Sequence, residues 1–335
     1  MNSSLILSIT TFVYGLAAFL YIFALIFKKT IPGRLATWTA ILGVIGNTLG
    51  VIFRWVESYR LGIGHAPLSN MYESLVFFAW TIVMLCLIIG KRYKNQTIGA
   101  FSTFLAFLVM AYASLFPSST IQPILPALKS NWLIAHVITC FIGYAAFAVA
   151  FGVSFMYLAK QGRDSDQINW FTFAKPVILF LLSALLSRII LHRTWAVSAV
   201  IALGACVVVY AAACVYKRFD PQKRDRFLAL FPDLRILDEL NRQLIMFGFL
   251  FLSVGIITGA VWANSAWGRY WGWDPKETWS LITWFIYATL LHARRMKGWH
   301  GKRIAFFSII GFMAVLFTYF GVNYLPGLHS YGSVG

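Results

Sequence analysis

Charged residues are scarce in this chain. Asp, Glu, Lys and Arg together make up 12% of its 335 residues, whereas hydrophobic residues make up 60%, and the mean hydropathy is +0.74. A soluble globular domain needs more polar surface than this to face water. The composition therefore excludes a soluble enzyme or binding domain and predicts a polytopic membrane protein.

Acidic residues are the rarer of the two charge types. The chain has 11 Asp and Glu against 28 Lys and Arg, which gives a formal net charge of +17. Such a basic excess is sometimes a sign of nucleic-acid binding. Here the basic residues lie in short segments between apolar runs, as in loops kept on the inner side of a membrane. We therefore expect no nucleic-acid partner.

Cysteine is sparse as well, and no CxxC pair occurs. The pattern therefore predicts neither a zinc site nor a disulfide framework. We expect the cysteines to act as small buried apolar residues, because all lie in or beside apolar runs: Cys86, Cys140, Cys206 and Cys214.

Long apolar runs, by contrast, are plentiful. A transmembrane helix needs about 17–25 predominantly apolar residues. The first run ends in Lys28-Lys29 and lacks a basic segment before it, which indicates a retained anchor rather than a cleaved signal peptide. We expect an all-α polytopic membrane protein with about ten transmembrane helices, at 5–27, 35–53, 74–90, 98–116, 133–158, 173–191, 195–216, 243–263, 277–293 and 304–325.

The distribution of basic residues predicts the orientation of these spans. With the amino terminus outside, most of the 28 Lys and Arg fall in inner loops, and the reverse orientation places most of them outside. Both termini and the segment 262–280 are then external. His65, His136 and His329 lie at the outer side, and His292 and His300 at the inner side.

One segment, Trp267–Trp279, is unusually rich in aromatic residues. It holds Trp267, Tyr270, Trp271, Trp273 and Trp279. Aromatic rings often collect at a membrane interface, and that explanation accounts for one or two of them. Because the intervening glycines leave room for a flat molecule against backbone and rings, we interpret the segment as a platform for a large planar ligand.

The polar residues of the same segment allow two interpretations. Asp274-Pro-Lys-Glu277 reads as a helix start, with Asp as the N-cap, Pro in the first turn and Glu three residues after the cap. Arg269 and Lys276 either pair with carboxylates of a ligand or extend toward the membrane surface. Glu73, at the start of an earlier span, is either a helix-start charge or part of the same outer cavity.

Histidines near this platform are candidate metal ligands. Imidazole is a common axial ligand of heme iron and is costly to keep in an apolar setting without a partner. His136 begins a span on the outer side and His329 follows the last span. Each alone is more often a solvated histidine, but two beside a tryptophan platform favour paired ligands. His292, next to Arg294 and Arg295, reads by itself as part of an inner basic cluster.

Three stretches carry a resemblance to a known family. Residues 262–279 (WANSAWGRYWGWDPKETW) resemble the WWD motif of heme-handling proteins. Residues 321–331 (GVNYLPGLHSY) and 67–74 (PLSNMYES) resemble the CcsA (ResC-type) family of System II cytochrome c biogenesis. The likeness extends over most of the chain.

The resemblance implies a function and a set of roles. In that family, a CcsA protein and a CcsB (ResB-type) membrane partner move heme b outward and present it for thioether attachment to the CxxCH motif of apocytochrome c. By position, His136 and His329 match the external ligands of heme iron and Trp267–Trp279, with Arg269 and Asp274, matches the porphyrin platform. His292 matches the intramembrane histidine on the route of transport. The protein supplies proximity and orientation rather than a nucleophile.

The same resemblance leads to expectations about domain organisation, further partners and the membrane. The chain is one integral membrane heme-handling domain over 1–335, with a core of about eight spans and an inserted hairpin at 173–216 to which we assign no function. Whether it counts as an enzyme, as a subunit of a holocytochrome c synthase (heme lyase), stays open. Thiol-reducing thioredoxin-like proteins are further expected partners. We expect a bacterial cytoplasmic membrane rather than a thylakoid.

Two other classes of protein remain as alternatives. A heme-delivery transporter that loads a heme chaperone needs the outer histidines and tryptophans but supports no attachment to CxxCH. A structural membrane subunit with an aromatic belt binds no heme and is colourless when purified. The overall layout of motifs favours the CcsA-type interpretation.

Overall fold

The structure, a computed structural model, describes residues 2–93, 95–123, 129–161 and 221–324. Within these ranges the secondary structure is entirely helical, as expected. The helices are α1 Ser3–Phe27, α2 Thr30–Arg60, α3 Met71–Tyr93, α4 Gln96–Leu115, α5 Asn131–Gln161, α8 Pro221–Leu228, α9 Leu234–Trp267, α10 Pro275–Lys297 and α11 Lys302–Tyr319, followed by the 3₁₀ helix η2 Gly321–Tyr324.

Seven of the described helices, α1, α2, α3, α4, α5, α9 and α11, are long and apolar enough to cross a membrane. The predicted span 277–293 coincides with α10, which is helical but less apolar because charged residues occupy both of its ends. The hairpin at 173–216, together with Cys206 and Cys214, lies outside the described residues. The all-helical membrane fold is therefore confirmed, and the count of about ten spans stays a prediction.

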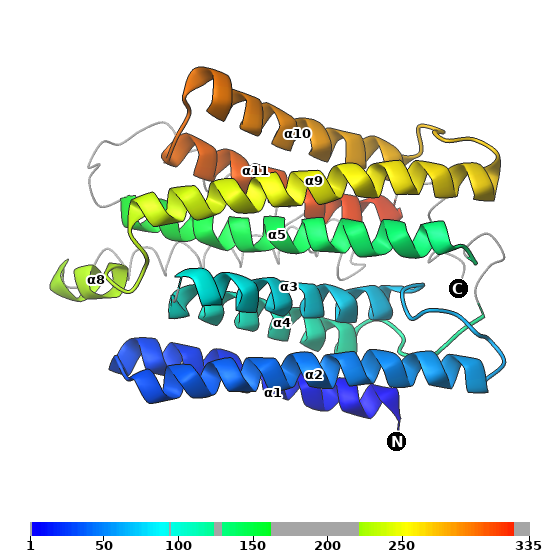
Figure 1. The fold of residues 1–335 in the computed structure, drawn as a ribbon, viewed down its shortest axis with the longest axis horizontal. Coiled ribbons are helices and arrows are strands. Elements are labelled where there is room, and N and C mark those ends of the chain that lie inside the picture. Colours follow the sequence, from blue (N-terminus) through cyan, green and yellow to red (C-terminus); the bar gives the residue numbers. More distant parts are fainter. Residues whose placement is uncertain (1, 94, 124–128, 162–220, 325–335) are drawn as a thin grey trace, which may run out of the picture. The chain divides into compact units, whose positions relative to one another are not determined.

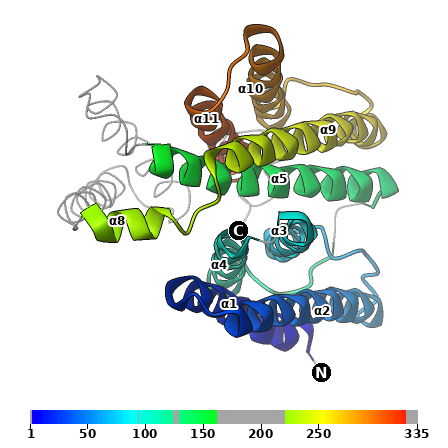
Figure 2. The same ribbon diagram turned by 60° about the vertical axis from the view of Figure 1, so that its left-hand side comes forward.

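The chain divides into two compact units. The first comprises Met1–Tyr157, Pro232–Gly272 and Trp284–Phe312, and the second comprises Leu158–Phe231, Trp273–Thr283 and Met313–Gly335. In the first unit the helices run alongside one another (Figure 1). Turning the molecule shows α1 and α2 packed together, with α4 against α1 and α3 against α4 (Figure 2). The expectation of a single heme-handling domain stays a prediction.

Phe147 of α5 is a buried contact point between helices of the first unit. Its ring stacks on Tyr287 of α10 with centroids 3.7 Å apart and planes 7° apart, and both side chains are fully buried. A Cβ at Gly248 of α9 would lie 2.6 Å from the same ring, so the absence of a side chain there lets α9 approach. Close approach through small residues is the usual way in which membrane helices pack. Three helices distant in sequence thus meet at one residue.

Cysteines in the described part of the chain behave as expected. Cys86 and Cys140 are buried and form no disulfide. Both lie on membrane-length helices, α3 and α5, where a thiol acts as a small apolar side chain.

Candidate functional site

His136 lies near the start of α5 and faces α9. Its Nδ1 is 2.7 Å from the carbonyl oxygen of Gly255. A carbonyl oxygen only accepts hydrogen bonds, so Nδ1 must carry the proton and donate it. In that tautomer the lone pair of a neutral imidazole is on Nε2, the arrangement typical of metal-binding histidines whose other nitrogen donates to a carbonyl.

Gly259 makes room for this imidazole. A Cβ added at Gly259 would lie 2.6 Å from His136 Nδ1 and 2.8 Å from its Cε1, so the ring occupies the space that a side chain would need. Gly255 and Gly259 are four residues apart and therefore lie on one face of α9. The Sγ atom of Cys140, one turn along α5, is 3.6 Å from Nδ1. The ring is thus held by contacts from two helices.

Tryptophans extend this arrangement toward the end of α9. The Trp262 ring is nearly parallel to the His136 ring, at 15°, with centroids 6.5 Å apart. Trp267 packs edge-on against Trp262 at 4.8 Å. Trp262 is buried, whereas Trp267 is partly exposed. We call His136, Trp262 and Trp267 the histidine–tryptophan cluster.

The helix end that carries Trp267 is sharply defined. Gly268 follows it with φ of 73°, the left-handed conformation that favours glycine, and its N–H donates to the Asn264 carbonyl. A Cβ at Gly272 would lie 2.8 Å from Arg269 Nε, so the Arg269 side chain folds over the Gly272 backbone. Tyr270 is 60% exposed and Trp271 is half-buried. The loop therefore turns an aromatic side chain and a cation outward.

The remainder of the predicted platform belongs to the second unit. Trp273 is 70% exposed and adopts φ of 56°, a left-handed conformation that is unfavourable for a bulky side chain. Trp279 instead packs inside the unit, with its ring 4.1 Å from that of Phe317 on α11. The tryptophans thus divide into one that faces solvent and one that anchors a helix.

The helix start predicted at Asp274 is confirmed. The Asp274 carboxylate accepts a hydrogen bond from the Lys276 N–H at 3.1 Å, and the Glu277 carboxylate accepts one from the Asp274 N–H at 3.2 Å. This reciprocal arrangement is a capping box. Burial lowers the pKa of Lys276, and the neighbouring Asp274 carboxylate opposes that shift. The carboxylates therefore have a structural role, whatever else they do.

His292 does not belong to the histidine–tryptophan cluster. It lies five residues before the end of α10 and is exposed. The neighbouring His300 is also exposed, and its Nδ1 is 3.9 Å from Asp238, which pairs with Arg294. His329 lies outside the described residues, so its predicted pairing with His136 stays a prediction.

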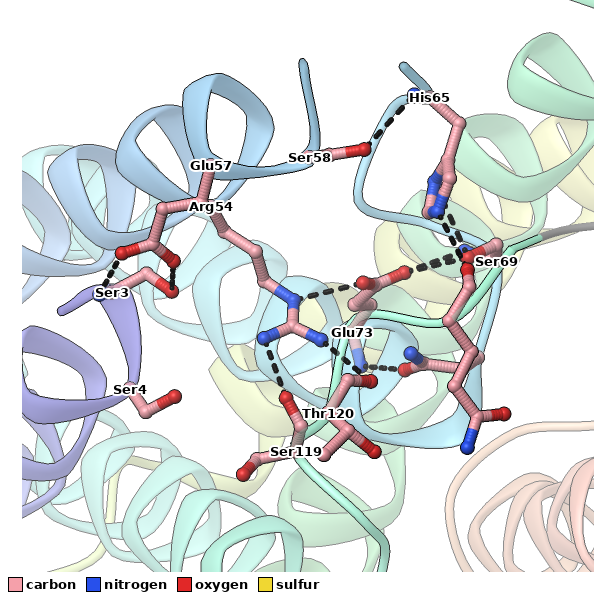
Figure 3. Close-up of polar contacts among 12 residues, drawn as sticks. Ser3, Ser4, Arg54, Glu57, Ser58, His65, Ser69, Glu73, Ser119 and Thr120 are labelled. Atoms are coloured by element: carbon pink, nitrogen blue, oxygen red, sulfur yellow. Dashed lines mark hydrogen bonds and ion pairs between the residues drawn. The ribbon is translucent and has the colours of Figure 1, made fainter. Parts of the chain in front are cut away.

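A buried ion pair, between Arg54 of α2 and Glu73 of α3, is a feature that the sequence left open. Arg54 Nε is 2.8 Å from Glu73 Oε1, and the two side chains are 2% and 1% exposed (Figure 3). Arg54 also donates to the carbonyl of Ser119, and Glu73 accepts from both the backbone N–H and the hydroxyl of Ser69. Glu73 thus fastens the loop before α3 rather than merely starting a helix.

His65 is buried beside this network. Its Nδ1 and Nε2 lie 2.9 and 3.3 Å from the carbonyl oxygens of Ala66 and Gln122. Its backbone N–H donates to the Ser58 hydroxyl (Figure 3). His65 therefore joins the loop before α3 to the segment after α4.

Trp262 and the two glycines that hold the His136 ring, Gly255 and Gly259, were not among the predicted site residues. The G-x-x-x-G pattern in α9 was the available signal, because it marks a helix face open to close packing. A bundle of membrane-length helices thus carries a histidine–tryptophan cluster between the first turns of α5 and the last turns of α9. These two helix ends lie side by side in Figure 1.

Comparisons with known proteins agree with a helical membrane protein that carries such a site. The family described as "Cytochrome C assembly protein" matches residues 68–329, and the chain belongs to this family. It is similar to the cytochrome c biogenesis protein CcsA of Pyropia yezoensis, 38% identical over 304 residues, which cover 89% of this chain and 87% of that protein. The corresponding protein of Gloeobacter violaceus is 35% identical over 327 residues, covering 94% and 92%.

A solved structure shares the fold. The protein titled "Cytochrome c Heme Lyase CcmF" superimposes with a TM-score of 0.58 at 14% identity. The match covers 96% of this chain and 47% of that one. At this identity the likeness concerns the fold alone.

Proposed function

We propose that this protein acts with a CcsB-type partner to carry heme b outward and to present it for covalent attachment to apocytochrome c. The family places the chain in cytochrome c biogenesis. The single observation that carries the finer proposal is the hydrogen bond from His136 Nδ1 to the Gly255 carbonyl. It fixes the ring in the tautomer suited to bind iron and holds it beside two tryptophans.

In this proposal, His136 and His329 are the external axial ligands of the heme iron. Tyr270, Trp271 and Trp273 line the porphyrin together with Trp267, and Arg269 pairs with a propionate carboxylate. The exposure of Tyr270 and Trp273 supports this assignment, because such large aromatic rings gain little for the fold while they remain exposed. The Asp274–Glu277 capping box and Trp279 hold the start of α10 in place and act on heme indirectly.

His292 is proposed as the ligand on the way across the membrane, together with a histidine of the partner. Its exposure on α10 supports a role shared with another chain, since an intramembrane histidine facing lipid alone is costly. Attachment then adds each cysteine S–H across a heme vinyl group, with sulfur bonding to one carbon and the proton going to the other. The residues of this chain orient the heme and exclude water, and the acceptor supplies the thiols.

A covalent-attachment assay in cells tests the proposal. The chain, its CcsB-type partner and an apocytochrome with CxxCH are co-expressed, and heme that survives denaturing electrophoresis is measured. We expect His136→Ala to lower the covalent product by about tenfold or more, whereas His300→Ala leaves it near the wild-type amount. Wild-type chain that binds heme yet yields no covalent product would favour the heme-delivery transporter instead.

A further inference from the structure

Two adjoining hollows lie along the end of α2, and their described lining residues include no member of the histidine–tryptophan cluster. The first is a cavity of about 320 Å³ with a mixed lining, whose polar residues include His65, Ser69, Lys129 and Ser130. The second is a shallow, open groove of about 540 Å³, whose described lining residues are Trp55, Val56, Tyr59 and Arg60 of α2. Trp55 and Tyr59 line both, so the cavity and the groove are continuous.

The chemistry changes along this continuous depression. At the cavity end, Lys129 is an exposed cation. The Ser130 hydroxyl accepts from the Trp132 N–H and keeps its own proton to donate, whereas the Ser69 hydroxyl already donates to Glu73. The groove is bounded by two aromatic rings and a valine, with Arg60 at its edge. Among the described residues that line either hollow, none is Asp or Glu. Such a site suits a ligand with an anionic head and an apolar tail.

The groove also continues into an apolar surface. Exposed hydrophobic side chains recur at three- and four-residue intervals along α2, which places them on one helical face: Trp38, Leu42, Ile45, Leu49, Ile52, Val56 and Tyr59. α2 is one of the membrane-length helices. An unbroken apolar stripe of this length favours contact with acyl chains, and Trp55 and Tyr59 are residue types that collect where hydrocarbon meets headgroups.

We propose that this depression binds one anionic phospholipid such as phosphatidylglycerol. Its phosphate pairs with Lys129 and Arg60, and one acyl chain runs over Trp55 and Val56 along the stripe of α2. The His65 ring is a fixed wall of the headgroup site, because both of its nitrogens face backbone carbonyls. The bound lipid contacts Ser130 and Asn131 at the start of α5, the helix that carries His136. This inference does not depend on the proposed function.

Native mass spectrometry of the complete protein, released from nanodiscs, tests this lipid site. Phosphatidylglycerol is compared with phosphatidylcholine of the same acyl chains, each titrated at equal concentrations. We expect wild type to retain phosphatidylglycerol preferentially. Lys129→Gln with Arg60→Gln should reduce that retention about 30-fold, and each single substitution about fivefold, as each cation near a membrane surface contributes about 1 kcal/mol.

A charge-matched control is available at the opposite helix ends. Lys29→Gln with Lys91→Gln removes the same two positive charges from exposed positions that line neither hollow, and it should keep the preference. Trp55→Ala should weaken retention of both lipids. The thermal midpoint of every variant is measured first, and only variants with the wild-type midpoint are compared. Where a double variant is less stable than wild type, the two single variants replace it.

Other outcomes overturn the lipid site. Inorganic phosphate that displaces the lipid at millimolar concentration would make the cavity a phosphate site, because the acyl chain would then add nothing. Cross-linking of Trp55 to the partner protein, with lipid absent from the complex, would make the depression a protein interface. If the charge-matched control lost phosphatidylglycerol to the same extent, the preference would come from the net charge of the protein and not from this site.

Discussion

The Nδ1 atom of His136 on α5 lies 2.7 Å from the carbonyl oxygen of Gly255 on α9. This contact joins residues 119 positions apart and sets the proton on one nitrogen of the ring. Histidines that bind iron or zinc are commonly held in this way by a carbonyl or carboxylate, and loss of such support typically weakens binding 10–100-fold. Substitutions that disturb the His136 ring should therefore weaken heme binding.

Replacing Gly259 by Ala should displace the His136 ring. The new Cβ would lie 2.6 Å from Nδ1, well inside contact distance. We expect heme affinity, measured by titration of the purified complex, to fall about 10-fold or more. Gly90→Ala is the matched control, because it also lies in a helix and a Cβ there meets no atom within 4 Å. Equal affinity in both variants would contradict a precisely held His136.

Two substitutions at Asp274 distinguish a structural role of its carboxylate from a direct role in ligand binding. Asp274→Ala removes the N-cap of α10 and should destabilise the protein by about 1 kcal/mol and lower heme attachment. Asp274→Asn keeps a good N-cap without the charge and should behave almost as wild type. The thermal midpoint and the covalent heme product are measured for both. If Asp274→Asn loses activity at an unchanged midpoint, the carboxylate itself acts on the ligand.

Trp273 should prove unfavourable for stability but needed for function. Its φ of 56° costs a non-glycine residue about 1–2 kcal/mol, and its ring is 70% exposed. Asn tolerates this conformation, so Trp273→Asn should keep or slightly raise the thermal midpoint while it reduces heme attachment. Trp271→Asn, at a half-buried position, should lower both. A fall in midpoint for Trp273→Asn would show that the ring supports the fold.

The Arg54–Glu73 pair should respond strongly to the loss of one partner. Glu73→Gln or Arg54→Met leaves a buried charge unpaired, which costs about 3–5 kcal/mol, and the double variant should cost less than the sum. Thermal midpoints of the single and double variants measure this coupling. The exposed pair Glu239–Arg242 provides the comparison, with side chains 43% and 35% exposed, and its coupling should stay below about 1 kcal/mol.

The membrane helices were largely predictable from the sequence. Apolar runs such as 5–27 and 243–263 fall within α1 and α9, because length and hydropathy alone decide whether a segment can cross a bilayer. The capping box at Asp274 was equally readable, since it depends on residues three positions apart. The predicted span 277–293 is helical as part of α10, but α10 is not among the helices apolar enough to cross a membrane, because both of its ends carry charged residues.

Contacts between distant segments could not be predicted in the same way. Nothing local in the sequence pairs His136 with Gly255, or Arg54 with Glu73 and the carbonyl of Ser119. A glycine spacing marks a helix face but not the residue that fills it. The roles of His136, His292 and the tryptophan platform stay predictions, since they concern a ligand.

The most direct test of the account is the absorption spectrum of the purified protein with its CcsB-type partner and ample heme. We expect a Soret band with sharp α and β bands on reduction, loss or displacement of these bands in His136→Ala, and their recovery when imidazole is added to that variant. His300→Ala should match wild type. A colourless wild type, or a His136→Ala spectrum identical to that of wild type, would contradict the assignment of His136 as a heme ligand.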